Sequence, residues 1–227
     1  MPAISHPGPA LRAVLFDLDG TLVDTADDFV PVVQSLQREF GTEPLPAERI
    51  RSCVSNGARA LVKLGLGLAE DDADFERWRQ RLLTLYGEIL GRHARLYPGV
   101  EDLLTAIEGA RLQWGIVTNK PRVYTLPLLE TLGLTPGSVV CPQDVEQPKP
   151  NPESLHKACG ELGCETRESL YIGDHERDII AGRAAGMYTI AAAYGYIEPG
   201  DSAHRWGADV VVESSMGLSE PIFNGTP

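Results

Sequence analysis

The chain has 227 residues, 43% of them hydrophobic, and carries a formal net charge of −12 at pH 7. This length suits one large domain or a domain with a smaller insert, and the hydrophobic share excludes a globally disordered chain. The negative charge argues against a nucleic-acid-binding surface, which needs a basic field, but still allows an anionic substrate. No apolar run approaches the length of a membrane span, so we expect no membrane partner either.

The amino-terminal residues 1–10 read MPAISHPGPA and lack the basic and apolar segments of a secretion signal. We predict a flexible tail there, because proline and glycine interrupt regular structure. The four cysteines form no CxxC pair and no zinc-binding spacing. Reduced thiols of this kind indicate a cytoplasmic protein. The sequence holds no indication of the oligomeric state.

A short apolar run predicts the first strand at residues 13–16, and a long helical region follows it. Residues 24–96 contain no convincing strand, and three of their segments have apolar residues at helical spacing, namely 25–41, 55–67 and 74–93. We therefore predict a helical cap subdomain over residues 24–96. It would be inserted into a core domain formed by residues 11–23 and 97–227.

The remainder of the chain alternates between predicted strands and predicted helices. The strands carry consecutive apolar residues, which is typical of strands buried on both faces of a parallel sheet, and several helices end near a glycine. Strands are predicted at residues 114–118, 138–141, 170–172, 189–193 and 209–212, and helices at 99–109, 121–132, 152–162 and 178–185. This order predicts an α/β fold with a doubly wound parallel sheet.

Two aspartates follow the first strand directly in the stretch AVLFDLDGTLVDT, residues 13–25. Asp17 and Asp19 alternate along an extended segment, so their side chains face the same way, roughly 6–7 Å apart along the chain. Ligands of open α/β sheets bind beyond the carboxyl ends of the strands, which places both carboxylates in the binding crevice. Two like charges this close repel each other and cost free energy to desolvate. A cation or a chemical task explains the pair better than an acidic turn does.

Three later segments add polar side chains at predicted strand ends. Thr118 and Asn119 end the stretch WGIVTN, although both residues are also common in turns. Lys149 lies between two prolines in QPKPNP, whose restricted backbone suits a lysine that must be aimed. Asp174 follows an apolar strand and a glycine, and Asp178 lies four residues later, where it could equally cap a helix.

All these side chains lie at the carboxyl ends of strands in one predicted sheet. Together they can supply a nucleophile, an acid or base, a clamp for phosphate and a site for a hard cation. Carboxylate oxygens favour Mg²⁺ over softer metals, so we expect Mg²⁺ as the cofactor.

The four segments resemble the four motifs of the haloacid dehalogenase superfamily in its phosphatase branch, from Leu11 to about Val212. The resemblance implies that Asp17 is the nucleophile and forms an aspartyl-phosphate. It implies that Asp19 protonates the leaving alcohol and later activates water. A small-molecule phosphomonoester would be the substrate.

The same resemblance implies ligands for the phosphoryl group and the metal. Thr118, Asn119 and Lys149 would bind the phosphoryl oxygens. Mg²⁺ would be held by the side chains of Asp17 and Asp174 and by the backbone carbonyl of Asp19. Asp178 would support these ligands. His175 departs from the pattern of many relatives, and we expect no role for it beyond loop packing.

The helical insert fits the family as a cap that excludes water and selects the substrate. Within it, SNGARALV resembles the segment that faces the site in phosphoglycolate phosphatases, which makes Arg59 a candidate substrate ligand. A solvated helix arginine is an equally good interpretation. The overall pattern favours the phosphoglycolate phosphatase-like subfamily. N-acetylmuramic acid 6-phosphate is the close alternative substrate, since WGIVTNKP and YGYIEPGDSAHRWGADVVV resemble that branch.

Other functions share parts of this pattern. A dehalogenase typically lacks the second aspartate of the first motif, and a cation-pump phosphorylation domain would need membrane spans. A β-phosphoglucomutase-like phosphotransferase shares all four motifs and stays open. A phospho-acceptor signalling domain is the non-enzymatic alternative, but it would have neither the cap nor Asp19.

Overall fold

The computed structural model describes residues 10–224, so all of the predicted tail except Ala10 lies outside the described residues. The main sheet has six parallel strands in the order β5-β4-β1-β6-β7-β8. Their bounds are β1 Ala13–Phe16, β4 Gln113–Val117, β5 Ser138–Val140, β6 Ser169–Gly173, β7 Tyr188–Ala192 and β8 Val210–Val212. The chain builds outward from β1 first on one side and then on the other, as a doubly wound sheet does.

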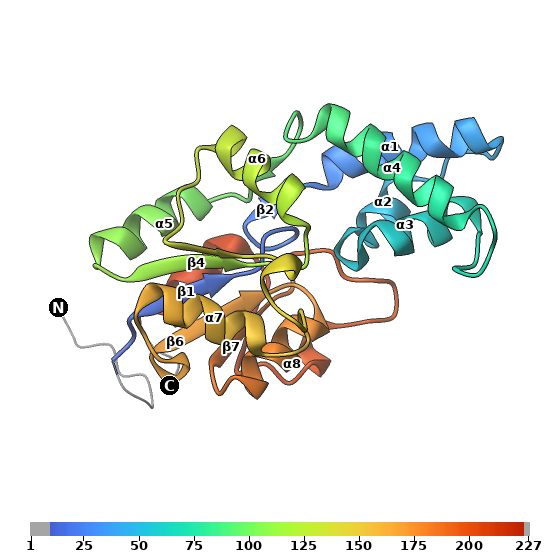
Figure 1. Cartoon of the computed structure of the whole chain (residues 1–227). Helices are drawn as coiled ribbons and strands as arrows, with labels where there is room; N and C mark the ends of the chain where they lie inside the picture. Colours follow the sequence, from blue (N-terminus) through green and yellow to red (C-terminus); the bar gives the residue numbers. More distant parts are fainter. Residues whose placement is uncertain (1–9, 225–227) are drawn as a thin grey trace.

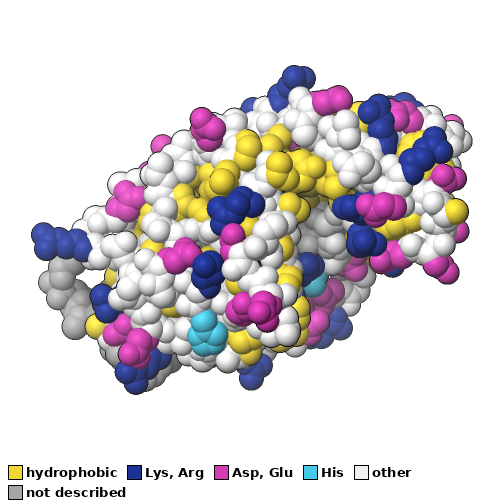
Figure 2. Space-filling view, in the orientation of Figure 1, with side chains coloured by type: hydrophobic (Ala, Val, Ile, Leu, Met, Phe, Trp, Pro, Cys, Tyr) yellow, Lys and Arg dark blue, Asp and Glu magenta, His cyan; other side chains and the backbone are white. Residues whose placement is uncertain are grey.

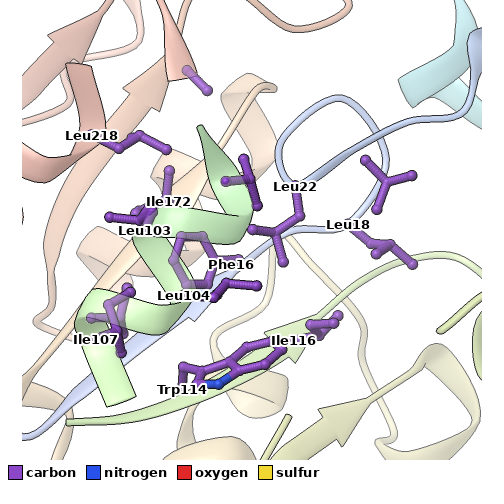
Figure 3. Close-up of a cluster of buried hydrophobic side chains, with 14 of the residues drawn as sticks. Phe16, Leu18, Leu22, Leu103, Leu104, Ile107, Trp114, Ile116, Ile172 and Leu218 are labelled. Atoms are coloured by element: carbon purple, nitrogen blue, oxygen red, sulfur yellow. The ribbon is translucent and has the colours of Figure 1, made fainter. Parts of the chain in front are cut away.

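Helices cover both faces of this sheet (Figure 1). One face packs against α5 Val100–Gly109, α6 Arg122–Leu132 and the short α9 Ser219–Phe223, and the other against α7 Glu153–Leu162 and α8 Glu176–Ala184. Strand β1 shows why the strands read as unbroken apolar runs. Its Val14 and Phe16 enter the first core, and Leu15 enters the second. Figure 3 shows the first core, in which Phe16 and Trp114 from the sheet meet Leu103 and Ile107 of α5.

In chain order, four helices between β1 and α5 form a second body, called the helical body below. They are α1 Ala26–Phe40, α2 Ala47–Arg51, α3 Gly57–Leu66 and α4 Phe75–Ile89, and a short 3₁₀ helix, Val54–Asn56, precedes α3. This body has its own buried cluster, which includes Phe29, Leu36, Leu61 and Leu82. In Figure 1 these helices lie beyond one end of the sheet, beside α6.

The expectation of no strand within residues 24–96 is wrong at both ends of that range. β2 Val23–Asp24 and β3 Arg95–Leu96 pair antiparallel, where the chain leaves the sheet and returns to it. Two-residue strands are too short to show any periodicity. They also pair across some seventy residues, and such contacts leave no local pattern.

The other predicted elements match the observed ones to within two residues at each end, except that α4 ends at Ile89, four residues before the end of the predicted segment 74–93, and that the short helices α2 and α9 were not predicted. Helix α8 begins at Glu176, two residues before its predicted start. Asp178 is therefore the third residue of that helix, and the alternative role as its N-cap is wrong, because His175 occupies that position. Within residues 10–224, none of the helices is both long and apolar enough to cross a membrane.

Candidate active site

The register of the three central strands brings the predicted site residues to one level. Phe16 at the end of β1 pairs with Ile116 of β4 and with Ile172 of β6. The backbone then continues this alignment, since Asp17 N–H donates to the Ile172 carbonyl at 2.8 Å. The residues that follow each strand therefore meet at the carboxyl edge of the sheet, where ligands of such folds bind.

Three aspartates form a buried acidic cluster at this edge. Oxygen atoms of Asp17, Asp174 and Asp178 all lie within 4.8 Å of one another. Lys149, which is also buried, places its Nζ 2.8 Å from Asp17 Oδ1 and 2.8 Å from Asp178 Oδ1. The Tyr171 hydroxyl accepts a further bond from Lys149 at 2.7 Å. Two of the three carboxylates thus pair with one buried ammonium group, and Asp174 has no ion pair with it.

The pKa values of the cluster show an excess of negative charge. Burial raises the pKa of Asp17 to about 6, and the neighbouring Asp178 and Asp19 add to this rise while Lys149 opposes it. Burial and the repulsion of Asp17 and Asp178 raise the pKa of Asp174 well above its usual range. Three negative charges against one positive charge fit a divalent cation, and an all-oxygen donor set fits a hard one.

Close backbone packing holds Asp174 within the cluster. Gly20 has a φ of +83°, and a Cβ there would lie 2.0 Å from Asp174 Oδ2. A Cβ on Gly195 would lie 2.2 Å from the Cβ of Asp174. The carboxylate accepts bonds from Tyr196 N–H at 2.8 Å and from the Ser55 hydroxyl at 2.8 Å. The loop after β7 and the helical body therefore both take part in positioning this aspartate.

Asp19 lies apart from the cluster, beside a lysine that sequence reasoning missed. Lys120 Nζ is 3.0 Å from Asp19 Oδ1, and its side chain is only 5% exposed. The Thr25 hydroxyl donates to the same Oδ1 at 2.6 Å. Burial lowers the pKa of Lys120, but Asp19 and Tyr86 together outweigh burial and hold that pKa above its usual value. In the sequence, Lys120 is simply a lysine shortly after a predicted strand, and nothing there distinguishes it from an exposed lysine.

Thr118 and Asn119 reach the edge of the sheet as predicted. The Thr118 hydroxyl accepts from Lys120 N–H at 3.1 Å. Asn119 donates to the backbone carbonyl of Lys149 at 2.9 Å and so joins the two loops. Its Oδ1 is buried and has no hydrogen-bond partner among the described residues. That oxygen and the Thr118 hydroxyl can serve a ligand in the crevice.

His175 does more than pack in its loop. Its Nδ1 accepts from Arg177 N–H at 3.2 Å, and its Nε2 lies 3.0 Å from Asn56 Oδ1. Burial and Arg177 lower the pKa of His175 to about 4, so the ring is neutral near pH 7 and Nε2 carries the hydrogen. Asn56 also donates to Glu198 at 2.7 Å. The expectation for His175 was therefore incomplete, because this histidine joins the sheet domain to the helical body.

A cavity of about 330 Å³ lies over these residues, between the sheet edge and the helical body. Its floor includes Asp17, Asp19, Thr118, Asn119, Lys120 and Lys149, and its opposite wall includes Phe29, Ser55, Arg59, Arg79 and Tyr86 of the helical body. Tyr124 of α6 also lines the cavity. Arg59 thus reaches the wall, but it is about half exposed and pairs with Glu70 at 3.0 Å. Figure 2 shows a hollow between the two parts, with Lys and Arg side chains at its edge.

Comparisons with known proteins agree with this geometry. The family described as haloacid dehalogenase-like hydrolase matches residues 14–192. An N-acetylmuramic acid 6-phosphate phosphatase of Pseudomonas aeruginosa is 46% identical, over 93% of this chain and 95% of that protein. A phosphoglycolate phosphatase of Xanthomonas campestris is 39% identical, over 92% and 96%. The crystal structure of a predicted phosphoglycolate phosphatase from Haemophilus somnus superposes with a TM-score of 0.83 at 25% identity, covering 93% and 98%.

Proposed function

The chain belongs to the haloacid dehalogenase-like hydrolases, and we propose that it is a Mg²⁺-dependent phosphatase that hydrolyses a small phosphomonoester through an aspartyl-phosphate. The predicted family and the predicted phosphatase class are confirmed by relatives that are named phosphatases. The observation that carries the proposed chemistry is the buried cluster of Asp17, Asp174 and Asp178 beside Lys149. A cytoplasmic location belongs to the proposal, and the four cysteines, all free thiols, support it.

Each residue at the sheet edge has a part in the proposed reaction. A carboxylate oxygen of Asp17 attacks phosphorus, the ester bond breaks, and Asp19 gives its proton to the departing alkoxide. Asp19 then takes a proton from water, which attacks the aspartyl-phosphate and releases inorganic phosphate. Lys149, Thr118 and Asn119 bind the equatorial phosphoryl oxygens, where negative charge is spread during the transfer.

The residues present fit the metal that this chemistry needs. Carboxylates of Asp17, Asp174 and Asp178 would hold Mg²⁺, with the backbone carbonyl of Asp19 as a further ligand. The unbalanced charge of the buried cluster supports this assignment. When bound, the ion neutralises charge on the phosphoryl oxygens and lets the nucleophile approach an anion.

We also propose that residues 24–96 act as a cap over the core domain of residues 11–23 and 97–227. The separate hydrophobic cluster of the four helices supports this division, as does the two-stranded β2–β3 pair at both crossings. The helical body forms one wall of the cavity, so its closure would exclude water from the phosphoryl group.

Two substrates are candidates, and they differ in size. A cavity of about 330 Å³ lies near the lower end of the ~300–1,000 Å³ range for small-molecule sites. A two-carbon phosphoglycolate would leave much of this space to water, whereas an N-acetylmuramic acid phosphate would occupy more of it. Two relatives named N-acetylmuramic acid 6-phosphate phosphatase are 46% and 42% identical, above the 39% of the phosphoglycolate phosphatase. These observations favour the amino-sugar phosphate and keep phosphoglycolate as the second candidate.

The proposal is tested by measuring phosphate release from both compounds with Mg²⁺ and with excess chelator. We expect activity that chelation abolishes and Mg²⁺ restores. A ratio of kcat/KM of tenfold or more, equal to about 1.4 kcal/mol of transition-state binding, would decide between the two substrates. Full activity in excess chelator would contradict the metal assignment, and release from neither compound would reject both substrates.

A further inference from the structure

Lys120 is buried between the acidic side chain of one domain and the aromatic side chains of the other. Its Nζ lies 3.0 Å from Asp19 Oδ1, and among the described residues Asp19 is the only carboxylate within ion-pair distance of it. The ammonium group also lies 4.6 Å from the ring centre of Tyr86 and 5.1 Å from that of Phe29. Those two rings belong to α4 and α1 and stack on each other with centres 4.0 Å apart.

The two oxygens of Asp19 have different surroundings. Oδ1 receives both side-chain donors, from Lys120 at 3.0 Å and from the Thr25 hydroxyl at 2.6 Å. Within residues 10–224, no hydrogen-bond donor reaches Oδ2, and Asp19 lines the cavity. Two donors on one oxygen fix the plane of the carboxylate and leave the other oxygen available to a ligand.

We propose that Lys120 is a positioning residue for the acid step, because it holds Oδ1 of Asp19 so that Oδ2 faces the leaving-group oxygen. This inference rests on the proposed phosphatase function and on the role of Asp19 as the acid. The stacked rings of Phe29 and Tyr86 restrict the lysine side chain. Through these rings the helical body acts on the orientation of Asp19 indirectly, by way of Lys120. A displacement of about 1 Å in such a group can cost roughly 10²-fold in rate.

This role predicts a dependence on the leaving group. Benzyl phosphate needs a proton on its departing alkoxide, whereas 4-nitrophenolate departs readily without one. The two esters carry rings of similar size, so they should make similar contacts in the cavity. The ratio kcat/KM covers only the steps through formation of the aspartyl-phosphate, and it therefore isolates protonation of the leaving group from the later attack of water.

The test compares Lys120→Met with the wild type on both esters. Methionine fills similar space and can still pack on the rings, but it cannot bind Oδ1. We expect kcat/KM for benzyl phosphate to fall by about 10–10²-fold and that for 4-nitrophenyl phosphate to fall by less than about threefold. Lys157→Met is the matched control, because Lys157 is an exposed lysine of α7 that pairs with Glu161. It should leave both ratios unchanged.

Two further variants separate positioning from other roles. In Asp19→Asn, adding Lys120→Met should cost nothing more on benzyl phosphate, because the residue through which the lysine acts is already disabled. Lys120→Gln keeps a donor for Oδ1 and should recover part of the loss, and it replaces the methionine variant if that variant unfolds. Equal losses on both esters would instead make Lys120 a ligand of the phosphoryl group and overturn the proposal. A wild-type protein that hydrolyses neither ester would overturn the phosphatase function and this inference together.

Discussion

The hydroxyl of Ser55 donates a 2.8 Å hydrogen bond to Oδ2 of Asp174, across 119 positions of the sequence. Ser55 belongs to the short 3₁₀ helix before α3, and Asp174 follows β6. One bond thus joins the helical body to the acidic cluster directly. The adjacent Asn56 adds bonds to His175, Arg177 and Glu198, so the same short segment makes several contacts with the sheet domain.

Removing this bond should loosen the contact between the two parts. We expect Ser55→Ala to lower the free energy of unfolding by about 1–3 kcal/mol, because a buried carboxylate loses a donor. Chemical denaturation measures this loss. Ser52→Ala is the matched control, since the Ser52 hydroxyl donates to the carbonyl of Arg49 within its own turn. An equal decrease in the free energy of unfolding in the two variants would contradict a stabilising role for the contact with Asp174.

Substitution of the two aspartates after β1 should separate their roles. Asp17→Asn removes the nucleophile, so turnover should fall to background in a steady-state phosphate-release assay. Asp19→Asn keeps the nucleophile but loses the acid and base, a loss of roughly 10²–10⁴-fold. Asp102→Asn, on an exposed position of α5, controls for a simple loss of charge. Wild-type turnover in either of the first two variants would refute its assigned role.

The raised pKa values of the cluster predict how stability changes with pH when no metal is bound. Asp17 and Asp174 bind protons more tightly in the folded than in the unfolded state, so their contribution is fully present below pH 3.8. It is lost as the pH rises through the folded pKa, which for Asp17 is about 6. We therefore expect Asp174→Asn to raise Tm above that of the metal-free wild type at pH 7, and this gain to shrink toward pH 4.

Thermal unfolding at a series of pH values, with chelator and with Mg²⁺, checks this expectation. Each 1 kcal/mol corresponds to a shift in Tm of about 2–4 °C for a chain of this size. Mg²⁺ should stabilise the wild type much more than Asp174→Asn, because the variant lacks one carboxylate of the cluster. A gain in Tm that does not depend on pH would mean that the substitution acts through packing rather than through charge.

The glycine beside Asp174 gives a purely steric prediction. A Cβ on Gly195 would lie 2.6 Å from the backbone oxygen of Gly20 and 2.2 Å from the Cβ of Asp174, and neither atom can move cheaply. Gly195→Ala should lower Tm and weaken the stabilisation by Mg²⁺, as measured by thermal unfolding. Gly160→Ala is the control, because a Cβ there meets nothing within 4 Å and alanine favours the helix by roughly 0.5–1 kcal/mol. A Gly195→Ala protein with wild-type Tm would contradict the packing argument.

Local patterns in the sequence were enough to predict the layout of the fold and the residues at the sheet edge. Runs such as Ala13–Phe16 are apolar at every position because both faces of the sheet are covered, and that local property identifies parallel strands. Polar residues that follow such runs must meet at one edge, whatever the details of packing. Asp17, Thr118 and Asp174 could therefore be placed together before any contact was known.

Which side chains are buried and which atoms meet depends on the packing of the helical body on the sheet. Lys120 and Lys157 look alike in the sequence, yet one is enclosed with Asp19 and two aromatic rings while the other lies on an exposed helix surface. The β2–β3 pair and the bond from Ser55 to Asp174 join segments some seventy or more residues apart. Such contacts follow from how the helical body packs on the sheet, and no local periodicity records that packing.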